Sequence, residues 1–247
     1  MSEYPDNKQP ICKQTLSTEE KPKEKVNHPQ HYGGQQNTYE AIKVIEKNKK
    51  RPFFLYLAHW AVHNPLQALK KDVDAISHHT KPHNLQVYSA MIRALDRSVG
   101  RILDTLDQND LSENTLIILT SDNGGASYIE LSDINKPYRG WKLTHFEGGM
   151  HIPFMAKWPR EIDAGTSFTP VVHHNDIFQT IAAAGKADIP KDRKLDGFNF
   201  LPYVKGEKNG KIHQTIFWRQ GHQQTVLHNG WTVSYTHLRA HETRGNL

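Results

Sequence analysis

An apolar run ends abruptly in an acid, an amide and two glycines in Thr115-Leu-Ile-Ile-Leu-Thr-Ser-Asp-Asn-Gly-Gly125. A continuous Leu/Ile run with polar residues at both ends is typical of a strand that is buried on both faces of a parallel sheet. Ligands of such sheets collect at the carboxyl ends of the strands. Asp122 and Asn123 would lie there as two oxygen donors, with Gly124 and Gly125 leaving space. The segment therefore predicts half of a site for a hard cation.

Length and composition bound the possibilities. A chain of 247 residues can hold one large α/β domain, or one domain with appendages. The net charge of +5 is mild and the basic residues are spread, so we expect no nucleic-acid partner. The single cysteine, Cys12, excludes an intrachain disulfide and a cysteine metal cluster. The longest apolar stretch, Phe53 to Val62, is too short to span a membrane, and the polar first twenty-five residues are unlike a secretory signal peptide.

The elements around this strand alternate as in a parallel α/β sheet. Arg51-Pro-Phe-Phe-Leu-Tyr-Leu-Ala58 predicts a second fully buried strand, and apolar residues recur every three or four positions in the long amphipathic helix that we expect over 84–106. The other predicted elements are a helix over Thr38–Lys47 capped by Thr38, a strand over Ile152–Trp158, a helix over Asp176–Ala184 that ends at Gly185, and edge strands over 216–219, 225–227 and 231–233.

If the sheet is parallel, four side chains converge at one edge. Asp122 and Asn123 end one strand, His63 follows the other, and Lys142 lies on the loop beyond the first. A carboxylate and a carboxamide suit Ca²⁺ or Mg²⁺, and a lysine beside a histidine would hold an anionic ester. Each residue also has a simpler explanation: a plain turn for Asp-Asn-Gly-Gly, a loop position for His63, and a solvated charge for Lys142.

Four segments in this order and spacing resemble the type I sulfatases. They are Arg51-Pro-Phe-Phe-Leu-Tyr-Leu-Ala-His-Trp-Ala-Val-His-Asn-Pro-Leu-Gln67, Tyr88-Ser-Ala-Met-Ile-Arg-Ala-Leu-Asp-Arg-Ser-Val-Gly100, Ser121-Asp-Asn-Gly-Gly125 and Tyr138-Arg-Gly-Trp-Lys-Leu-Thr-His-Phe-Glu-Gly-Gly149. The likeness runs from near Thr38 to near Val233. Within it, Val62-His-Asn-Pro-Leu-Gln67 and Tyr138-Arg-Gly-Trp-Lys142 are most similar to the arylsulfatase B-like branch.

The resemblance implies an alkaline-phosphatase-like α/β/α sandwich with a mostly parallel central sheet, here incomplete. By position, Asp122 and Asn123 match the family's calcium ligands, Lys142 the lysine that bridges sulfate and leaving oxygen, and His63 the histidine that protonates the departing alcohol. The implied activity is hydrolysis of sulfated sugars or aryl sulfates by a formylglycine nucleophile with one Ca²⁺, without nucleic-acid or membrane partners. A phosphatase or phosphodiesterase of the same superfamily, or a non-catalytic binding fragment, is the alternative.

Two features depart from the family pattern. The Cys/Ser-x-Pro-x-Arg motif that yields formylglycine is absent, since Cys12 is followed by neither the proline nor the arginine, and the N-terminal Asp-Asp pair that completes the calcium site is also absent. Two oxygen ligands should bind Ca²⁺ weakly, because that ion takes six to eight. We therefore expect no sulfatase turnover by this polypeptide as written.

Both ends differ in character from the middle. Residues 1–37 are predicted to be disordered or foreign, with a likeness to a small phage-associated domain, residues 38–233 to form the sulfatase-like α/β domain, and residues 234–247 to be a non-native tail resembling a translated sequencing adaptor. The hypothesis is a chimeric or truncated gene. Localisation is unknown on this sequence, although members of the family are usually periplasmic, secreted or lysosomal.

Overall fold

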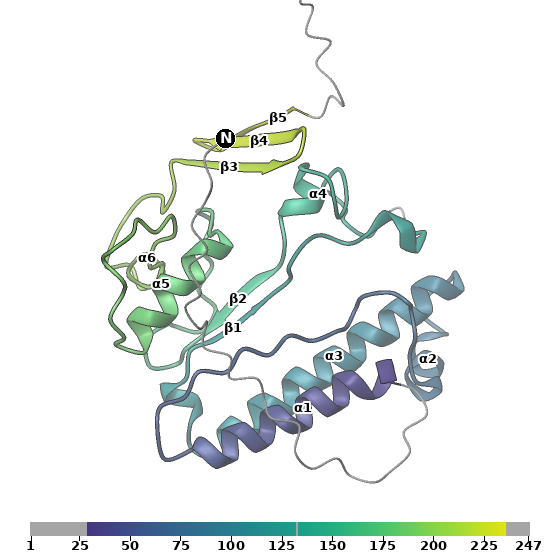
Figure 1. Ribbon diagram of the computed structural model, residues 1–247. Helices are drawn as coiled ribbons and strands as arrows, with labels where there is room; N and C mark the ends of the chain where they lie inside the picture. Colours follow the sequence, from purple (N-terminus) through teal and green to yellow (C-terminus); the bar gives the residue numbers. More distant parts are fainter. Residues whose placement is uncertain (1–28, 132, 236–247) are drawn as a thin grey trace, which may run out of the picture.

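The computed structural model describes residues 29–131 and 133–235 (Figure 1). Helices and strands follow one another as α1 (Pro29–Asn48), α2 (Lys70–Ile76), α3 (His83–Gln108), β1 (Ile117–Thr120), α4 (Glu147–Met150), β2 (Phe154–Lys157), α5 (His174–Ala184), α6 (Leu201–Val204), β3 (Thr215–Gln220), β4 (Gln223–His228) and β5 (Trp231–Tyr235). Short 3-10 turns, η1 (Ser112–Asn114) and η2 (Ser127–Ile129), flank β1. Within the described ranges, no helix is long and apolar enough to cross a membrane.

The two longest helices, α1 and α3, pack against each other and form one layer (Figure 1). α3 confirms the amphipathic helix predicted over 84–106, and it buries Ala90 and Leu106. α1 begins at Pro29 rather than at the predicted cap, so the assignment of Thr38 as an N-cap is wrong. Thr38 instead lies buried inside the helix, and its hydroxyl hydrogen-bonds that of Ser98 in α3. This polar contact aligns two otherwise apolar faces.

A second core lies between the β1–β2 pair and the segment around α6. Phe154 of β2 packs edge-on against the fully buried Phe200, with ring centroids 5.6 Å apart. Ile118 and Ala156 contact the same cluster, which also includes Leu201. One face of the strand pair is therefore covered by the α5–α6 part of the chain (Figure 1).

β1 pairs with β2 in the antiparallel direction, so this pair is not one of the parallel pairs expected in the sheet. Ile117 lies opposite Lys157, and Thr120 lies opposite Phe154. A parallel pair needs a crossover that returns the chain to the starting end of the first strand. Here the connecting loops fold back onto the end of β1, because the Gly124 amide donates to Gly149 O at 3.0 Å, and β2 therefore starts where β1 stops. The predicted α/β class is confirmed.

The segment 51–58 is extended but belongs to no described strand, so the prediction of a strand buried on both faces is wrong. Burial alternates along it: Phe53, Leu55 and Leu57 are half-buried, whereas Phe54 is 70% and Tyr56 81% exposed. A strand is buried on both faces only when neighbouring strands and a second layer cover it. The apolar run had predicted burial, but one face of this segment is open.

The C-terminal predictions are confirmed. β3, β4 and β5 form an antiparallel meander over the three predicted edge strands, and α5 covers the helix predicted to end at Gly185. The predicted division of the chain stays a prediction: its first boundary, 37/38, falls inside α1, and residues 1–28 and 236–247 lie outside the described residues.

Replacing an aromatic side chain on the open face should improve solution behaviour without loss of stability. For Tyr56→Lys we expect a free energy of unfolding within about 0.5 kcal/mol of the parent, because an exposed side chain makes few contacts, and less self-association, because an edge lysine opposes strand pairing. The matched change Leu55→Lys on the half-buried face should destabilise by roughly 1–3 kcal/mol. Urea denaturation and light scattering measure both, and equal destabilisation by the two variants would contradict the assignment of faces.

Candidate functional site

Two glycine-containing turns interlock just beyond β1. The Gly148 amide donates to Arg139 O at 2.7 Å, and the Gly124 amide donates to Gly149 O. A Cβ on Gly124 would lie 1.8 Å from the carbonyl oxygen of Gly148, and one on Gly148 would lie 2.3 Å from Gly140 O. No side chain fits at these positions, so the loop after β1 has a fixed place against α4.

The side chain of Asn135 joins the same turns. Its Oδ1 accepts from the Gly125 amide at 2.8 Å, while its Nδ2 donates to Gly125 O at 2.9 Å and to Gly140 O at 3.0 Å. The backbone amide of Lys142 also donates to Gly125 O, at 3.0 Å. One carboxamide therefore sets the distance between the Asp122–Gly125 loop and the loop that carries Lys142.

His63 and Lys142 meet although 79 positions separate them. Lys142 Nζ lies 3.2 Å from His63 Nε2. His63 Nδ1 lies 2.8 Å from Asn64 O, and because a carbonyl only accepts, Nδ1 carries a hydrogen. An ammonium only donates, so Nε2 is the acceptor, and the ring is the neutral Nδ1–H tautomer. Trp60 packs edge-on against this ring, with centroids 5.8 Å apart.

Asp122 and Asn123 lie on the loop directly beyond β1, as predicted. Asp122 is exposed, and Asn123 donates from Nδ2 to Gly124 O at 2.9 Å. The described contacts tie this loop to Lys142 through the Gly125 carbonyl and show no direct contact between these two side chains and His63 or Lys142. The structure therefore brings His63 and Lys142 into direct contact. Asp122 and Asn123 are connected to that pair only through the backbone of their loop.

The donor chemistry of Asp122 and Asn123 suits a hard cation, but the set is too small. Among the described residues there is no group of three or more His, Cys, Asp or Glu side chains that could hold a metal ion. Because Ca²⁺ takes six to eight oxygens, these two residues do not form a complete calcium site. The assignment of Asp122 and Asn123 as calcium ligands therefore stays a prediction.

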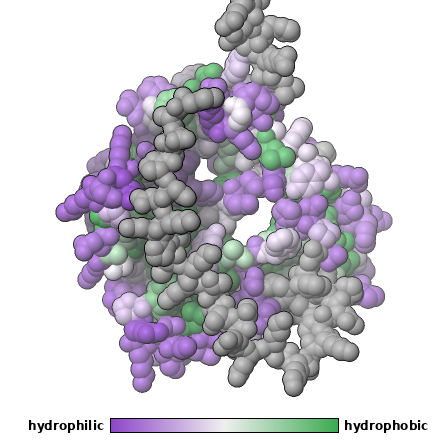
Figure 2. Space-filling model, viewed as in Figure 1, coloured by the Kyte–Doolittle hydropathy of each residue, from purple (hydrophilic) through white to green (hydrophobic). Residues whose placement is uncertain are grey.

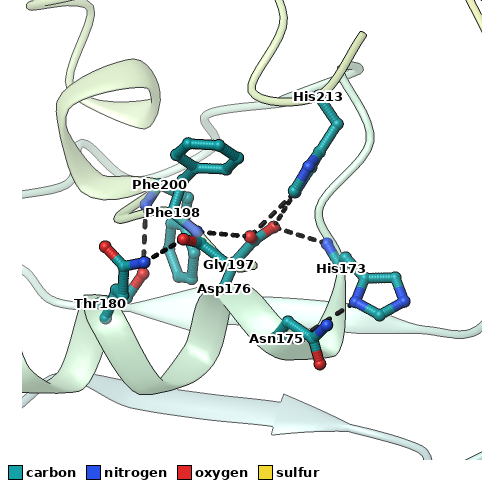
Figure 3. Close-up of polar contacts among 9 residues, drawn as sticks. His173, Asn175, Asp176, Thr180, Gly197, Phe198, Phe200 and His213 are labelled. Atoms are coloured by element: carbon teal, nitrogen blue, oxygen red, sulfur yellow. Dashed lines mark hydrogen bonds and ion pairs between the residues drawn. The ribbon is translucent and has the colours of Figure 1, made fainter. Parts of the chain in front are cut away.

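A buried carboxylate, Asp176, joins the start of α5 to the segment around Phe198 and to His213 (Figure 3). Asp176, fully buried, accepts from the His173 amide at 2.7 Å, from the Phe198 amide at 2.8 Å and from His213 Nε2 at 2.8 Å. His173 Nδ1 in turn accepts from the Asn175 amide at 3.1 Å, which completes a capping box at the start of α5. His174, the first residue of α5, has its Nε2 3.0 Å from Ser121 O. The helix start is thereby attached to the end of β1.

Comparison with known proteins shows the family of the chain. The family model described as Sulfatase matches residues 2–187. The chain belongs to the sulfatase family. Human steryl-sulfatase is 34% identical over 201 residues, covering 78% of this sulfatase chain and 33% of that protein, and human N-acetylgalactosamine-6-sulfatase is 36% identical over 166 residues, covering 66% and 30%. The crystal structure of Ps i-CgsB in complex with k-i-k-neocarrahexaose has a TM-score of 0.75 at 31% identity, covering 82% of this chain and 46% of that one.

The sulfatase chain spans about a third of the length of the curated relatives that it matches. The family prediction is confirmed. The arylsulfatase B-like branch stays a prediction. The roles of the four site residues also stay predictions, although His63 and Lys142 are in contact.

Sequence reasoning missed Asn135 and His174. Asn135 lies on the loop before Lys142, and nothing in the sequence marks its side chain as the group that joins the two turns. Nothing in the sequence distinguishes His174 from the other histidines of the chain, and only the fold shows its contact with Ser121 O.

Removing the Asn135 carboxamide should loosen the joint between the two loops. For Asn135→Leu we expect a loss of roughly 1–3 kcal/mol in the free energy of unfolding, because backbone groups of Gly125 and Gly140 lose their partner in a half-buried place. Denaturant titration measures the loss. Asn114→Leu is the control, at an exposed amide that accepts from Arg160 at 3.2 Å, and it should change stability by less than about 0.5 kcal/mol. Equal effects would contradict a special role for Asn135.

The stability of the chain should fall below neutral pH. Burial lowers the pKa values of His173, His59 and His145 below the ordinary value of about 6.5, and for His173 it outweighs the opposing effect of Asp176. The unfolded chain therefore binds more protons, so this stability is fully present above about pH 6.5 and is lost as the pH falls through the lowered values.

The variant His173→Asn separates the contribution of His173 to this pH dependence from those of His59 and His145. Asparagine keeps a side-chain acceptor for the helix start but does not titrate, so we expect nearly unchanged stability at pH 7.5 and a shallower loss between pH 7.5 and 5.5. Thermal melts across this range provide the measurement. A decline as steep as that of the parent would show that protonation of His173 is not involved.

Proposed function

We propose that this chain carries the sulfate-facing part of a sulfuric ester hydrolase site, for a sulfated carbohydrate or an aryl sulfate. The observation that carries the proposal is the 3.2 Å contact between Lys142 Nζ and His63 Nε2. Membership of the sulfatase family supports the reaction class. Human N-acetylgalactosamine-6-sulfatase and the carrahexaose-bound Ps i-CgsB support a sulfated sugar as the substrate class.

The geometry gives each residue a part. Lys142 presents an ammonium whose hydrogens are directed at an acceptor, and a sulfate ester entering beside it would replace the imidazole as that acceptor. His63 keeps Nδ1 on the Asn64 carbonyl, so Nε2 stays directed at the same place. After Nε2 gains a proton it would deliver it to the leaving oxygen, as a general acid does. The ordered pair therefore combines anion binding with proton transfer at one point.

Asp122 and Asn123 would contribute two of the oxygen donors to a Ca²⁺ ion, which when bound supplies charge neutralisation for a sulfate. The remaining donors, and the formylglycine that the family uses as its nucleophile, have no counterpart among the residues assigned to the site. We therefore derive no step through either group, and we propose that this polypeptide binds sulfate esters without turning them over. The phosphoesterase alternative is not favoured, because the relatives compared are sulfatases.

Lys142→Ala tests the proposal. Titration with 4-methylumbelliferyl sulfate, followed through the NMR signals of the His63 ring, should show binding by the parent that weakens about tenfold in the variant, since one charge-assisted contact contributes about 1.5 kcal/mol or more. Lys136→Ala is the control, because that exposed ammonium pairs with Asp133 at 2.8 Å and should not matter. Equal binding by parent and Lys142→Ala would refute the assignment of the site.

Release of the fluorescent alcohol is measured in the same samples with added Ca²⁺. We expect no release above the blank. Turnover of the sulfate ester would contradict the proposal that the chain is inactive alone, and turnover of the matching phosphate ester would support the phosphoesterase alternative.

A further inference from the structure

A cavity of about 280 Å³ lies behind the loop that carries His63, between that loop and helices α1, α2 and α3. Its walls are mainly apolar. Trp60, Pro65 and Leu69 form the loop side, and Met91, Ala94 and Leu95 form the α3 side. An engineered cavity of about 150 Å³ with walls of this kind stays dry and binds benzene, so the larger volume here has room for a fused two-ring body.

One wall of the cavity is polar, and its two charged side chains form an ion pair with each other. Asp72 is 2% exposed, and its two oxygens each accept from the Arg97 guanidinium at 2.9 Å. Arg97 lowers the pKa of Asp72, so the carboxylate stays ionised and paired. This ion pair gives the wall a fixed shape and leaves no net charge for a ligand to meet there.

The remaining charges at the cavity are positive. Lys71 and Arg101 both line it, and both are exposed, which places their charges at the mouth. Within the described residues neither makes an ion pair like that of Arg97. His59 lines the interior, where burial lowers its pKa and keeps it neutral, with Nε2 3.5 Å from Ser98 Oγ. The cavity thus combines an apolar interior, neutral polar groups and a cationic mouth.

We propose that this cavity binds a small planar aromatic acid, with the rings inside and the carboxylate at the mouth beside Lys71 and Arg101. The site is separate from the His63–Lys142 pair but shares a wall with it. Trp60 lines the cavity on one side and packs against the His63 ring on the other. An occupant would therefore contact the loop that positions His63 without touching His63.

Isothermal titration of the full chain with 2-naphthoate tests the site. We expect one molecule bound per chain, with quenching of the indole emission that is lost in Trp60→Phe. Ala94→Leu and Ala68→Leu each place three more carbons in the cavity and should weaken binding at least tenfold. Two filling variants are used so that a folding defect in one, detected by circular dichroism, does not decide the result.

The charge at the mouth is tested separately. Arg101→Gln should weaken 2-naphthoate binding several-fold, and 2-naphthalenemethanol, which has the same rings without the charge, should bind the parent several-fold more weakly than 2-naphthoate. The difference between the two ligands should shrink at high salt, because exposed charges are screened. Equal binding of both ligands in low salt would overturn the choice of an acid.

Two further variants decide where the ligand lies. Lys142→Ala should leave 2-naphthoate binding unchanged, and loss of binding there would place the acid at the proposed sulfate pair. Tyr56→Ser, on the open face of segment 51–58, should also leave it unchanged. Unchanged binding by properly folded Ala94→Leu and Ala68→Leu would overturn the proposal, whatever the outcome of the sulfate ester experiment.

Discussion

The close fit of two backbone turns at the end of β1 is the constraint on which the rest of the site depends. A side chain is excluded at Gly124 by the Gly148 carbonyl, and at Gly148 by the carbonyls of Gly140 and Arg139. Hydrogen bonds through the Gly124 amide and the Asn135 carboxamide then hold the turns together. The first turn carries Asp122 and Asn123, which could bind a cation, and the second loop carries Lys142, which could bind an anion. The fit of the two turns therefore sets the position of these loops relative to each other. Opposite charges on a bound ion and a bound sulfate would meet there.

The same fit explains the direction of β2. The loops return the chain to the end of β1, and β2 runs back along β1 from that point. α5 adds an attachment from the other side, since His174 contacts the Ser121 carbonyl while Asp176 joins the helix to the backbone of Phe198 and to His213. The end of β1 is thus held by the loops before β2, by β2 itself and by α5, and each of them contributes hydrogen bonds.

Local patterns predicted the elements that depend on local chemistry. The periodicity over 84–106, the helix that ends at Gly185 and the alternating strands after Ile216 need no knowledge of distant residues, and all three are confirmed. Segment 51–58 and the direction of β2 depend on which strands become neighbours, which an apolar run does not encode. For the site, the resemblance placed His63 with Lys142. Asn135 was missed because a side chain that hydrogen-bonds the backbone of Gly125 and Gly140 leaves no period in the sequence.

The two partners of the His63–Lys142 contact are held very differently. Lys142 follows a turn that is anchored by the Gly125 and Gly140 carbonyls. His63 follows the extended segment 51–58, which belongs to no described strand, and its own loop is held by a turn hydrogen bond from its amide to Trp60 O at 3.0 Å and by ring contacts with Trp60. The 3.2 Å contact therefore joins a firmly anchored group to a weakly anchored one. If an anion were to take the ammonium of Lys142, as proposed, the loop that carries His63 would be the part that adjusts to it, because fewer contacts hold that loop.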